Sequence, residues 1–405
     1  MSRVYLDHAA TSPMSGAVLD AYTDALRIVG NPSSIHSDGQ AAKAMLEDAR
    51  AAIAASVNAD PMEVVFTSGG TEAINLAIKG LYWRRAERGF TRILLTGAEH
   101  HATLDAAQWL AKHEGAVLDW VPVDAVGRID LAALETRLAA ADDVALVTTL
   151  WANNEVGTVQ PVRDVVALAE VHGVPVHADA VGAYLSVPID FAATGLAAMS
   201  LSAHKIGGPV GVGALVVARA WEPEALIHGG GQQRARSGTM DAAGAHAFRA
   251  AMERHSALDR SPAASDRLAT ATATAHLAAL RERLVAGVQA AVPAAVLRGD
   301  PDLTVDSAGR GARLPSNAHF TFPGCEGDSL LYLLDTAGFS VSTGSACQAG
   351  VPEASHVLLA MGLTEADARG ALRFTLGHTT TDADVDALVA ALPDAVERAR
   401  RAGMA

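Results

Sequence analysis

The sequence predicts an α/β fold: a large domain with a mostly parallel mixed sheet flanked by helices, and a smaller α+β domain. The first observation is that short apolar runs, typical of buried strands, alternate with helical patterns through the first half of the chain. Such alternation indicates helices on both faces of a sheet and ligands at the carboxyl ends of its strands. Strands are expected at residues 63–67, 92–96, 117–121, 144–150, 174–178, 197–202 and 212–217, and helices at 40–57, 71–88 and 101–114.

The second observation is a change of pattern near residue 254. A polar stretch over residues 254–266 precedes a long alanine-rich helix that runs to about residue 292. We therefore predict a large domain over residues 15–260, and a small domain built from residues 1–14 and 261–405. The small domain is expected to contain a loop at 299–313, a strand at 317–322 and helices at 327–337 and 382–401.

Size and composition narrow the class of protein. The chain has 405 residues, of which 50% are hydrophobic, so it can build a large core and suits about two domains. A net charge of −14 without a long basic run argues against nucleic acid as a direct partner. Two cysteines cannot form a disulfide framework or a complete cysteine metal site, which favours a reducing compartment. No signal peptide or membrane-spanning run is seen, so we expect a cytoplasmic protein.

Lys205 is the first candidate for chemistry. It lies in Ser202-Ala203-His204-Lys205, at the end of the apolar run 197–201 and before a glycine-rich turn. Burial disfavours an ammonium, so a lysine leaving a buried strand loses its proton more easily than an exposed one. A neutral lysine can form an imine with an aldehyde cofactor.

Two further segments fit such a cofactor. Residues 67–72 (TSGGTE) join a strand to a helix, where glycines and free N–H groups can hold a phosphate and Thr71 is a candidate N-cap. Asp179 ends an apolar strand, and a protonated pyridine nitrogen would supply the partner that its buried carboxylate needs. Taken alone, the first segment also suits an ordinary helix cap, and Asp179 also suits a cap or a local turn.

A histidine and a cysteine complete the candidate set. His100 follows the strand at 92–96 and could stack on a flat ring and move protons, although a lone histidine is more often structural. Cys347 lies among small residues in 342–350 (STGSACQAG), which suggests an accessible thiol able to act as a thiolate nucleophile. Cys325 precedes a helix and is expected to be non-catalytic.

The order of the motifs resembles the cysteine desulfurases, which are pyridoxal-phosphate enzymes of fold type I in the class V aminotransferase group. The resemblance runs nearly end to end, and the short cysteine loop is similar to the branch that matures iron–sulfur and nitrogenase proteins. The matching motifs are 5–11 (YLDHAAT), 30–36 (GNPSSIH), 68–72 (SGGTE), 99–100 (EH), 153–157 (NNEVG), 177–180 (HADA), 202–205 (SAHK), 236–239 (RSGT), 344–347 (GSAC) and 373–377 (RFTLG).

The resemblance implies a role for each position. Lys205 would carry pyridoxal 5′-phosphate as an imine and later take the substrate α-proton. Asp179 would pair with the ring nitrogen, His100 would stack on the ring, and Asn154 would lie beside the ring oxygen. Cys347 would take sulfur from L-cysteine as a persulfide, leaving L-alanine. The phosphate would be bound by Gly70, Thr71, Ser202 and His204, with Thr239 from the second subunit of a homodimer; the substrate carboxylate would be bound by Arg373 and Asn31.

The resemblance also implies partners and leaves alternatives. A sulfur-acceptor or iron–sulfur scaffold protein would receive the sulfur, no resident metal is expected, and Cys347 could transiently ligate a cluster. Two other hypotheses stay open: a different enzyme with the same cofactor, such as an aminotransferase or a selenocysteine lyase, and a degenerate scaffold that binds sulfur acceptors.

The sequence departs from the family at three places. Gly182 stands where relatives usually have a glutamine that hydrogen-bonds the cofactor's ring oxygen. The loop at 228–239 is one residue shorter, which puts the reach of Thr239 in doubt. Val210 stands where lysine is common, which we regard as neutral. We expect weaker cofactor binding, with activity retained.

Overall fold

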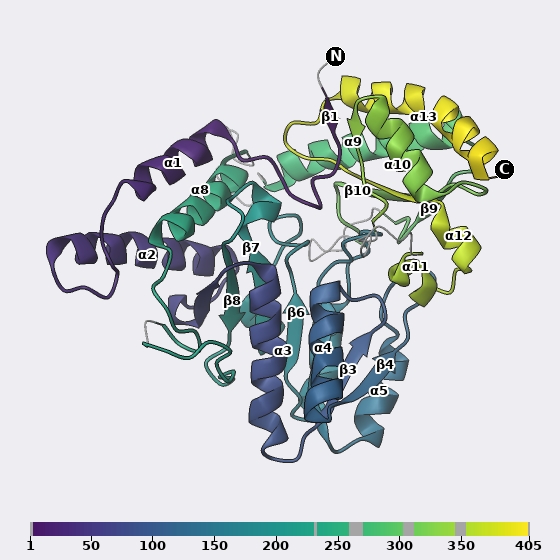
Figure 1. Cartoon of the computed structure of the whole chain (residues 1–405). Coiled ribbons are helices and arrows are strands. Elements are labelled where there is room, and N and C mark those ends of the chain that lie inside the picture. Colours follow the sequence, from purple (N-terminus) through teal and green to yellow (C-terminus); the bar gives the residue numbers. More distant parts are fainter. Residues whose placement is uncertain (1–2, 231–232, 259–269, 303–311, 345–353, 404–405) are drawn as a thin grey trace.

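The computed structural model describes residues 3–230, 233–258, 270–302, 312–344 and 354–403 (Figure 1). Its largest feature is a seven-stranded sheet in the order β2-β8-β7-β6-β5-β3-β4. Neighbouring strands are parallel except at β8, which runs antiparallel to both β2 and β7, so the predicted mostly parallel mixed sheet is confirmed. The strands are β2 (Val64–Thr67), β3 (Arg92–Thr96), β4 (Val117–Val121), β5 (Val144–Leu150), β6 (Val176–Asp179), β7 (Ala198–Ser202) and β8 (Gly213–Val217).

Helices cover both faces of this sheet because the central strands are apolar on both sides. On β3, Leu94 joins a core with helices α2, α5, α6 and α8, whereas Ile93 and Leu95 join a core with α3 and α4. The helices of this part are α1 (Gly16–Leu26), α2 (Ser37–Ser56), α3 (Gly70–Ala86), α4 (His101–Glu114), α5 (Leu131–Ala140), α6 (Val162–Val171), α7 (Phe191–Thr194) and α8 (Ala242–Leu258), with short 3₁₀ helices η1 (Pro61–Glu63) and η2 (Ala203–Ile206).

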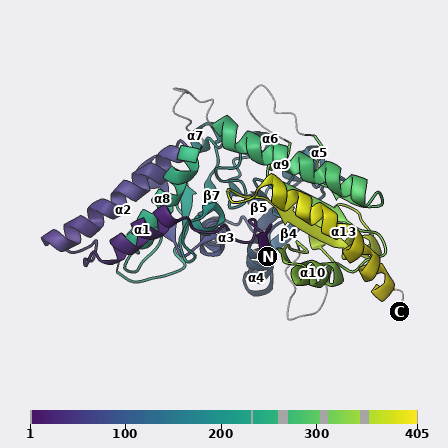
Figure 2. The same ribbon diagram turned by 90° about the horizontal axis from the view of Figure 1, so that it is seen from above.

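A second, separate core lies around two small sheets. Phe320, Leu372 and Phe374 pack there against α9, α10 and α13. Of these helices, α9 and α13 lie side by side (Figure 2). One sheet is antiparallel, in the order β12-β10-β9, and the other pairs β1 with β11. The elements are β1 (Val4–Tyr5), β9 (Val296–Arg298), β10 (Asn317–Thr321), β11 (Phe339–Ser340), β12 (Ala371–Thr375), α9 (Thr270–Ala291), α10 (Gly327–Thr336), α11 (His356–Ala360), α12 (Glu365–Arg369) and α13 (Asp382–Gly403).

The N-terminal segment connects the two parts. β1 pairs with β11, Ala9 N–H donates to the Thr375 hydroxyl at 2.8 Å, and Ser12 N–H donates to the carbonyl of His204 at 2.9 Å. Residues 6–13 therefore lie between β12 and η2, the elements that carry Arg373 and Lys205. Among the described residues, no helix is long and apolar enough to cross a membrane.

Candidate active site

A cavity of about 630 Å³ opens at the carboxyl ends of the parallel strands, where the fold class predicts a ligand. Leu150, Asp179 and Ser202 are the last residues of β5, β6 and β7, and all three line it. Eight of the predicted site residues share this cavity: Gly70, Thr71, His100, Asn154, Asp179, Ser202, His204 and Lys205.

Lys205 is held on the short helix η2 and points at the N-terminal segment. Its Nζ donates to the carbonyls of Ala9, at 2.5 Å, and Ala10, at 3.0 Å. Burial lowers the pKa of Lys205 to about 8, and the positive charge of Arg373 adds to this, whereas Asp179 and Asp7 oppose it. A sizeable fraction of the amine is therefore neutral near physiological pH and able to attack an aldehyde.

Asp179 is a buried carboxylate, 3% exposed, that faces the cavity. Val181 N–H donates to its Oδ1 at 3.0 Å. Burial raises the pKa of Asp179 to about 6, and this hydrogen bond and the charge of Lys205 oppose the rise. A cation placed beside it in the cavity would favour the ionised form further, so the carboxylate suits a protonated ring nitrogen.

The start of α3 forms the anion-binding end. The helix begins at Gly70 after Gly69, whose φ of +146° is in the region that favours glycine. A Cβ on Gly70 would lie 2.7 Å from Val181 Cγ2, so only glycine fits this wall of the cavity. Sequence analysis offered Thr71 as the N-cap, but the structure places the cap at Gly69 and Thr71 in the first turn. Free N–H groups, the helix dipole and the Thr71 side chain suit a phosphate.

His100 combines a structural contact with a place on the cavity wall. It caps α4, because its Nδ1 accepts from Ala102 N–H at 3.1 Å, and it lines the cavity. An accepting Nδ1 places the proton of the neutral ring on Nε2. Burial and then the charge of Lys205 lower the pKa of His100 to about 4, so the ring is neutral and fit to stack on an aromatic cofactor.

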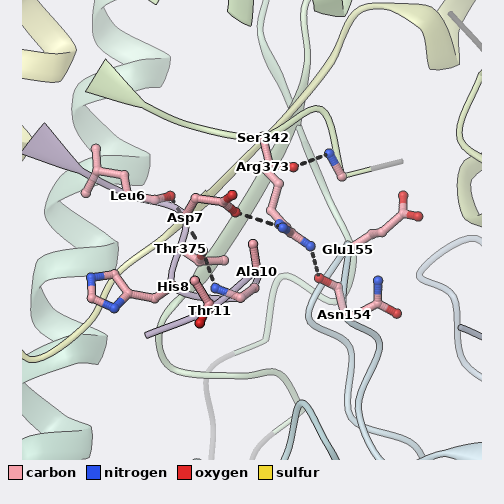
Figure 3. Close-up of polar contacts among 12 residues, drawn as sticks. Leu6, Asp7, His8, Ala10, Thr11, Asn154, Glu155, Ser342, Arg373 and Thr375 are labelled. Carbon is pink, nitrogen blue, oxygen red and sulfur yellow. Dashed lines mark hydrogen bonds and ion pairs between the residues drawn. The ribbon is translucent and has the colours of Figure 1, made fainter. Parts of the chain in front are cut away.

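Arg373 lies beside the cavity, where its guanidinium is held from two sides (Figure 3). Nη1 donates to the carbonyl of Asn154 at 2.8 Å, and Nη2 donates to Asp7 Oδ1 at 2.9 Å. The side chain is buried, and its Nε has no hydrogen-bond partner among the described residues. These two contacts use two of the five N–H donors of the guanidinium, although Arg373 is not among the residues that line the cavity. Asp7 had no signal in the sequence apart from its place in the motif 5–11.

The remaining predicted residues lie elsewhere. Asn31 is exposed in the connection between α1 and α2, where its Oδ1 accepts from Ser33 N–H at 2.9 Å. Thr239 is exposed and does not line the cavity of its own chain. Cys347 lies outside the described residues, so its predicted position is not tested. Cys325, expected to be non-catalytic, is buried, and burial raises the pKa of its thiol.

Comparison with known proteins identifies the class of protein. Residues 4–388 match the family described as aminotransferase class-V, so the chain belongs to that family. Within it the chain belongs with the cysteine desulfurases: it is 50% identical to the "IscS-like cysteine desulfurase" of Mycobacterium tuberculosis, over 99% of this chain and 98% of that protein. A solved "NIFS-like protein" aligns with a TM-score of 0.86 at 32% identity, over 98% of this chain and 100% of the other. Another, titled "SspA in complex with cysteine", aligns with a TM-score of 0.74 at 31% identity, over 92% and 98%.

Enzymes of this class depend on pyridoxal phosphate, and the cavity fits that group. Asn154 Oδ1 and Ser202 Oγ are buried polar atoms with no hydrogen-bond partner among the described residues. Both line the cavity, together with the Lys205 amine and the Asp179 carboxylate. Unpaired buried polar atoms are rare in folded proteins, so this set indicates a polar ligand. The predicted fold type, enzyme class and cofactor are confirmed.

Proposed function

We propose that this enzyme converts L-cysteine to L-alanine and transfers the sulfur to Cys347 as a persulfide. The observation that supports it most directly is one cavity containing an amine with a lowered pKa, a buried carboxylate and a helix N-terminus. Pyridoxal-phosphate chemistry requires three groups: an amine that forms the imine, a carboxylate that keeps the ring nitrogen protonated, and a site for the phosphate.

Each side chain of the cofactor side has one task. Gly70, Thr71, Ser202 and His204 hold the phosphate, with Thr239 reaching across from a second subunit. Asp179 keeps the ring nitrogen protonated, and His100 stacks on the ring. Asn154 hydrogen-bonds the ring oxygen. When bound, pyridoxal phosphate supplies an electron sink next to the substrate Cα.

The substrate side binds the amino acid by its carboxylate. Arg373 offers its remaining N–H donors to that carboxylate, and Asn31 helps to bind it. Lys205, freed when the substrate amine takes its place, accepts the Cα proton on Nζ. Its carbonyl contacts at Ala9 and Ala10 keep the amine within the cavity while it holds that proton.

Sulfur transfer requires a thiolate. Cys347 Sγ attacks the substrate sulfur, a new S–S bond forms, and the Cβ–S bond breaks with its electron pair moving to Cβ. Protonation of Cβ and return of a proton to Cα then give L-alanine, and the transferred sulfur stays on Cys347 as a persulfide. No external oxidant or reductant is needed.

The wider setting is also a proposal. We place the large domain at residues 15–260 and the small domain at 1–14 and 261–405. The enzyme acts as a homodimer in the cytoplasm and passes sulfur to an acceptor or iron–sulfur scaffold protein, where Cys347 can transiently contact a cluster. The scarcity of cysteines, which suits a reducing compartment, supports the location.

Mass spectrometry of Cys347 after incubation with L-cysteine tests the proposal. We expect a gain of one sulfur atom on Cys347, and no gain in Lys205→Ala. Alanine and sulfide release that survives Cys347→Ala would favour a lyase. The scaffold hypothesis would be favoured if the purified protein had no visible imine absorbance, or if L-cysteine did not discharge that absorbance.

A further inference from the structure

Glu99 is a second buried carboxyl group, close enough to Asp179 to feel its charge. It is 1% exposed and follows β3, whose last residue, Thr96, donates its hydroxyl to Glu99 Oε1 at 2.7 Å. The backbone of Leu150, at the end of β5, also hydrogen-bonds the carboxyl. Leu150 pairs with Asp179 across the sheet. Both acidic residues therefore adjoin the end of β5.

The two carboxyls compete for one negative charge, because buried like charges that interact cannot both form at low cost. Burial raises the pKa of Glu99 to about 8; the Thr96 hydrogen bond opposes the rise, and the charge of Asp179 adds to it. Asp179 is the better place for a charge, since Val181 N–H donates to its Oδ1 at 3.0 Å and Lys205 attracts it. The proton that the pair retains near neutral pH therefore belongs on Glu99.

The position of the cavity supports the same assignment. Leu150 and Asp179 line it, whereas Glu99 is not among the described residues that do so. A protonated ring nitrogen in the cavity can thus pair with Asp179 directly. A charge on Glu99 would lack such a partner, and a buried charge without a partner is unfavourable.

Other titratable and charged groups surround the two carboxyls. They are His100 and His101 at the start of α4, Lys205 on η2, His356 on α11 and Arg373 on β12. His356 Nε2 contacts the backbone carbonyl of Glu99 at 2.8 Å, and its ring lies 4.6 Å from that of His101. Among the described residues, the charge that acts on the Glu99 carboxyl is that of Asp179, which favours the protonated form.

We propose that Glu99 is a positioning residue for the ring-nitrogen site: it keeps its proton beside ionised Asp179 and so confines the negative charge of the pair to the carboxylate that faces the cavity. The inference rests on the proposed function, because it assumes that Asp179 pairs with the ring nitrogen. Glu99 acts through Asp179 and is not itself a catalytic residue.

An infrared pH titration of the full-length, cofactor-free protein tests the protonation directly. We expect the carbonyl stretch of a protonated carboxyl to disappear with a midpoint near pH 8, and to be absent from Glu99→Gln. Thr96→Val should raise this midpoint, because the hydroxyl favours the charged form, and Asp179→Asn should lower it, because a like charge is gone. Each shift should be about 0.5 to 1 pH unit.

Thr321→Val is the matched control for Thr96→Val. Thr321 is also a buried threonine that ends a strand, β10, and its hydroxyl accepts from the Arg298 side chain at 2.9 Å. This substitution removes a comparable hydrogen bond in the other core of the molecule. It should leave the midpoint unchanged.

Thermal unfolding of cofactor-free protein gives a second readout. The folded protein holds a proton on Glu99 that the unfolded chain releases above about pH 4.5, so wild type should lose stability relative to Glu99→Gln as pH rises from 4.5 to about 8. Between pH 6 and pH 8 the gap in melting temperature should widen by at least about 2 °C. Asp179, whose pKa is about 6, contributes chiefly below this range.

Cofactor affinity at pH 7 separates a protonated Glu99 from an ionised one. Glu99→Gln should keep most of the affinity, because an amide has the shape of a protonated carboxyl and no charge. Glu99→Leu, which removes the acceptor for Thr96 and Leu150, should lose about 5- to 10-fold. Should Glu99→Leu fail to fold, the infrared titration decides the matter without it.

Three results would overturn the inference: a midpoint below pH 6, a carboxyl band that persists in Glu99→Gln, or equal losses of cofactor affinity in the glutamine and leucine variants. The proposed function fails separately. If Glu99 titrates near pH 8 but wild type forms no imine band with pyridoxal phosphate, the assignment of Asp179 to the ring nitrogen is wrong, and with it the role of Glu99.

Discussion

The two sides of the cavity are built in different ways. The cofactor side uses residues at or just after the ends of neighbouring strands, namely His100 after β3, Asp179 on β6 and Ser202 on β7. The substrate side is assembled from residues far apart in the chain, because Arg373 binds both Asp7 and Asn154. One side depends on a single sheet, and the other depends on the docking of three segments.

This difference indicates which substitutions should abolish the reaction and which should only shift the reacting groups out of position. A sheet positions its strand ends rigidly, so substitutions on the cofactor side remove a function without moving its neighbours. Contacts between distant segments hold the substrate side in place, so substitutions there should alter geometry and sulfur transfer more than cofactor binding.

The largest effect is expected from Lys205→Ala. Without the amine there is no imine and no base for the Cα proton, so alanine formation should fall at least about 10³-fold, as for other residues that act covalently. The visible imine band should be absent even with added cofactor. An imine band or near-normal turnover in this variant would remove the basis for treating the cofactor side as the chemical centre.

Asp179→Asn should separate stability from activity. Burial raises the pKa of Asp179 from 3.8 to about 6, so the ionised carboxylate destabilises the cofactor-free fold above pH 6, and this penalty disappears as pH falls below about 4. Cofactor-free Asp179→Asn should therefore have a free energy of unfolding higher than that of wild type at pH 8, by on the order of a few kcal/mol, and should match wild type at pH 4.

The activity of Asp179→Asn should change in the opposite direction to its stability. The variant should lose alanine formation, because an amide cannot hold the ring nitrogen protonated. Lower thermal stability at pH 8, or full activity, would contradict the assignment of Asp179.

Gly344→Ala tests the substrate side. Gly344 has φ +87°, and an added Cβ would lie 3.2 Å from His319 Nε2, so alanine is strained by both its backbone and its contacts. Sulfur gain on Cys347 should fall by about tenfold or more, while substrate binding seen by absorbance stays close to wild type. Gly338→Ala is the control, because Gly338 also has a positive φ, +96°, but an added Cβ meets nothing within 4 Å. Equal effects in both variants would point to backbone strain alone.

The fold could be predicted largely because its signals are local. Apolar runs gave every strand of the large sheet within about two residues at each end, and the glycine-rich turn placed the start of α3. The antiparallel pairing of β8 with β2 and the pairing of β1 with β11 are contacts between distant segments, for which a single sequence carries no periodic signal.

In the site, too, local signals could be predicted and contacts between distant segments could not. Lys205, Asp179 and His100 each follow a predicted strand, so their meeting at one sheet edge could be expected from the fold class. Asp7 lay within a quoted motif but had no assigned role, because its partner Arg373 is 366 residues away in sequence. The roles of all these residues in the reaction stay predictions, as do those of Asn31, Thr239 and Cys347.

The smallest effect is expected at Gly182, where the chain lacks the family's glutamine. Gly182 lines the cavity, and a Cβ there would lie 3.7 Å from the Ala152 carbonyl, which is ordinary contact, so a side chain fits. Gly182→Gln should restore a hydrogen bond worth about 1 kcal/mol and lower the cofactor dissociation constant about fivefold. Gly182→Ala is the matched control and should not tighten binding. Because the change is confined to the cofactor side, the rate of sulfur gain at saturating cofactor should stay the same; a glutamine that changed this rate but not cofactor affinity would mean that the two sides are not independent.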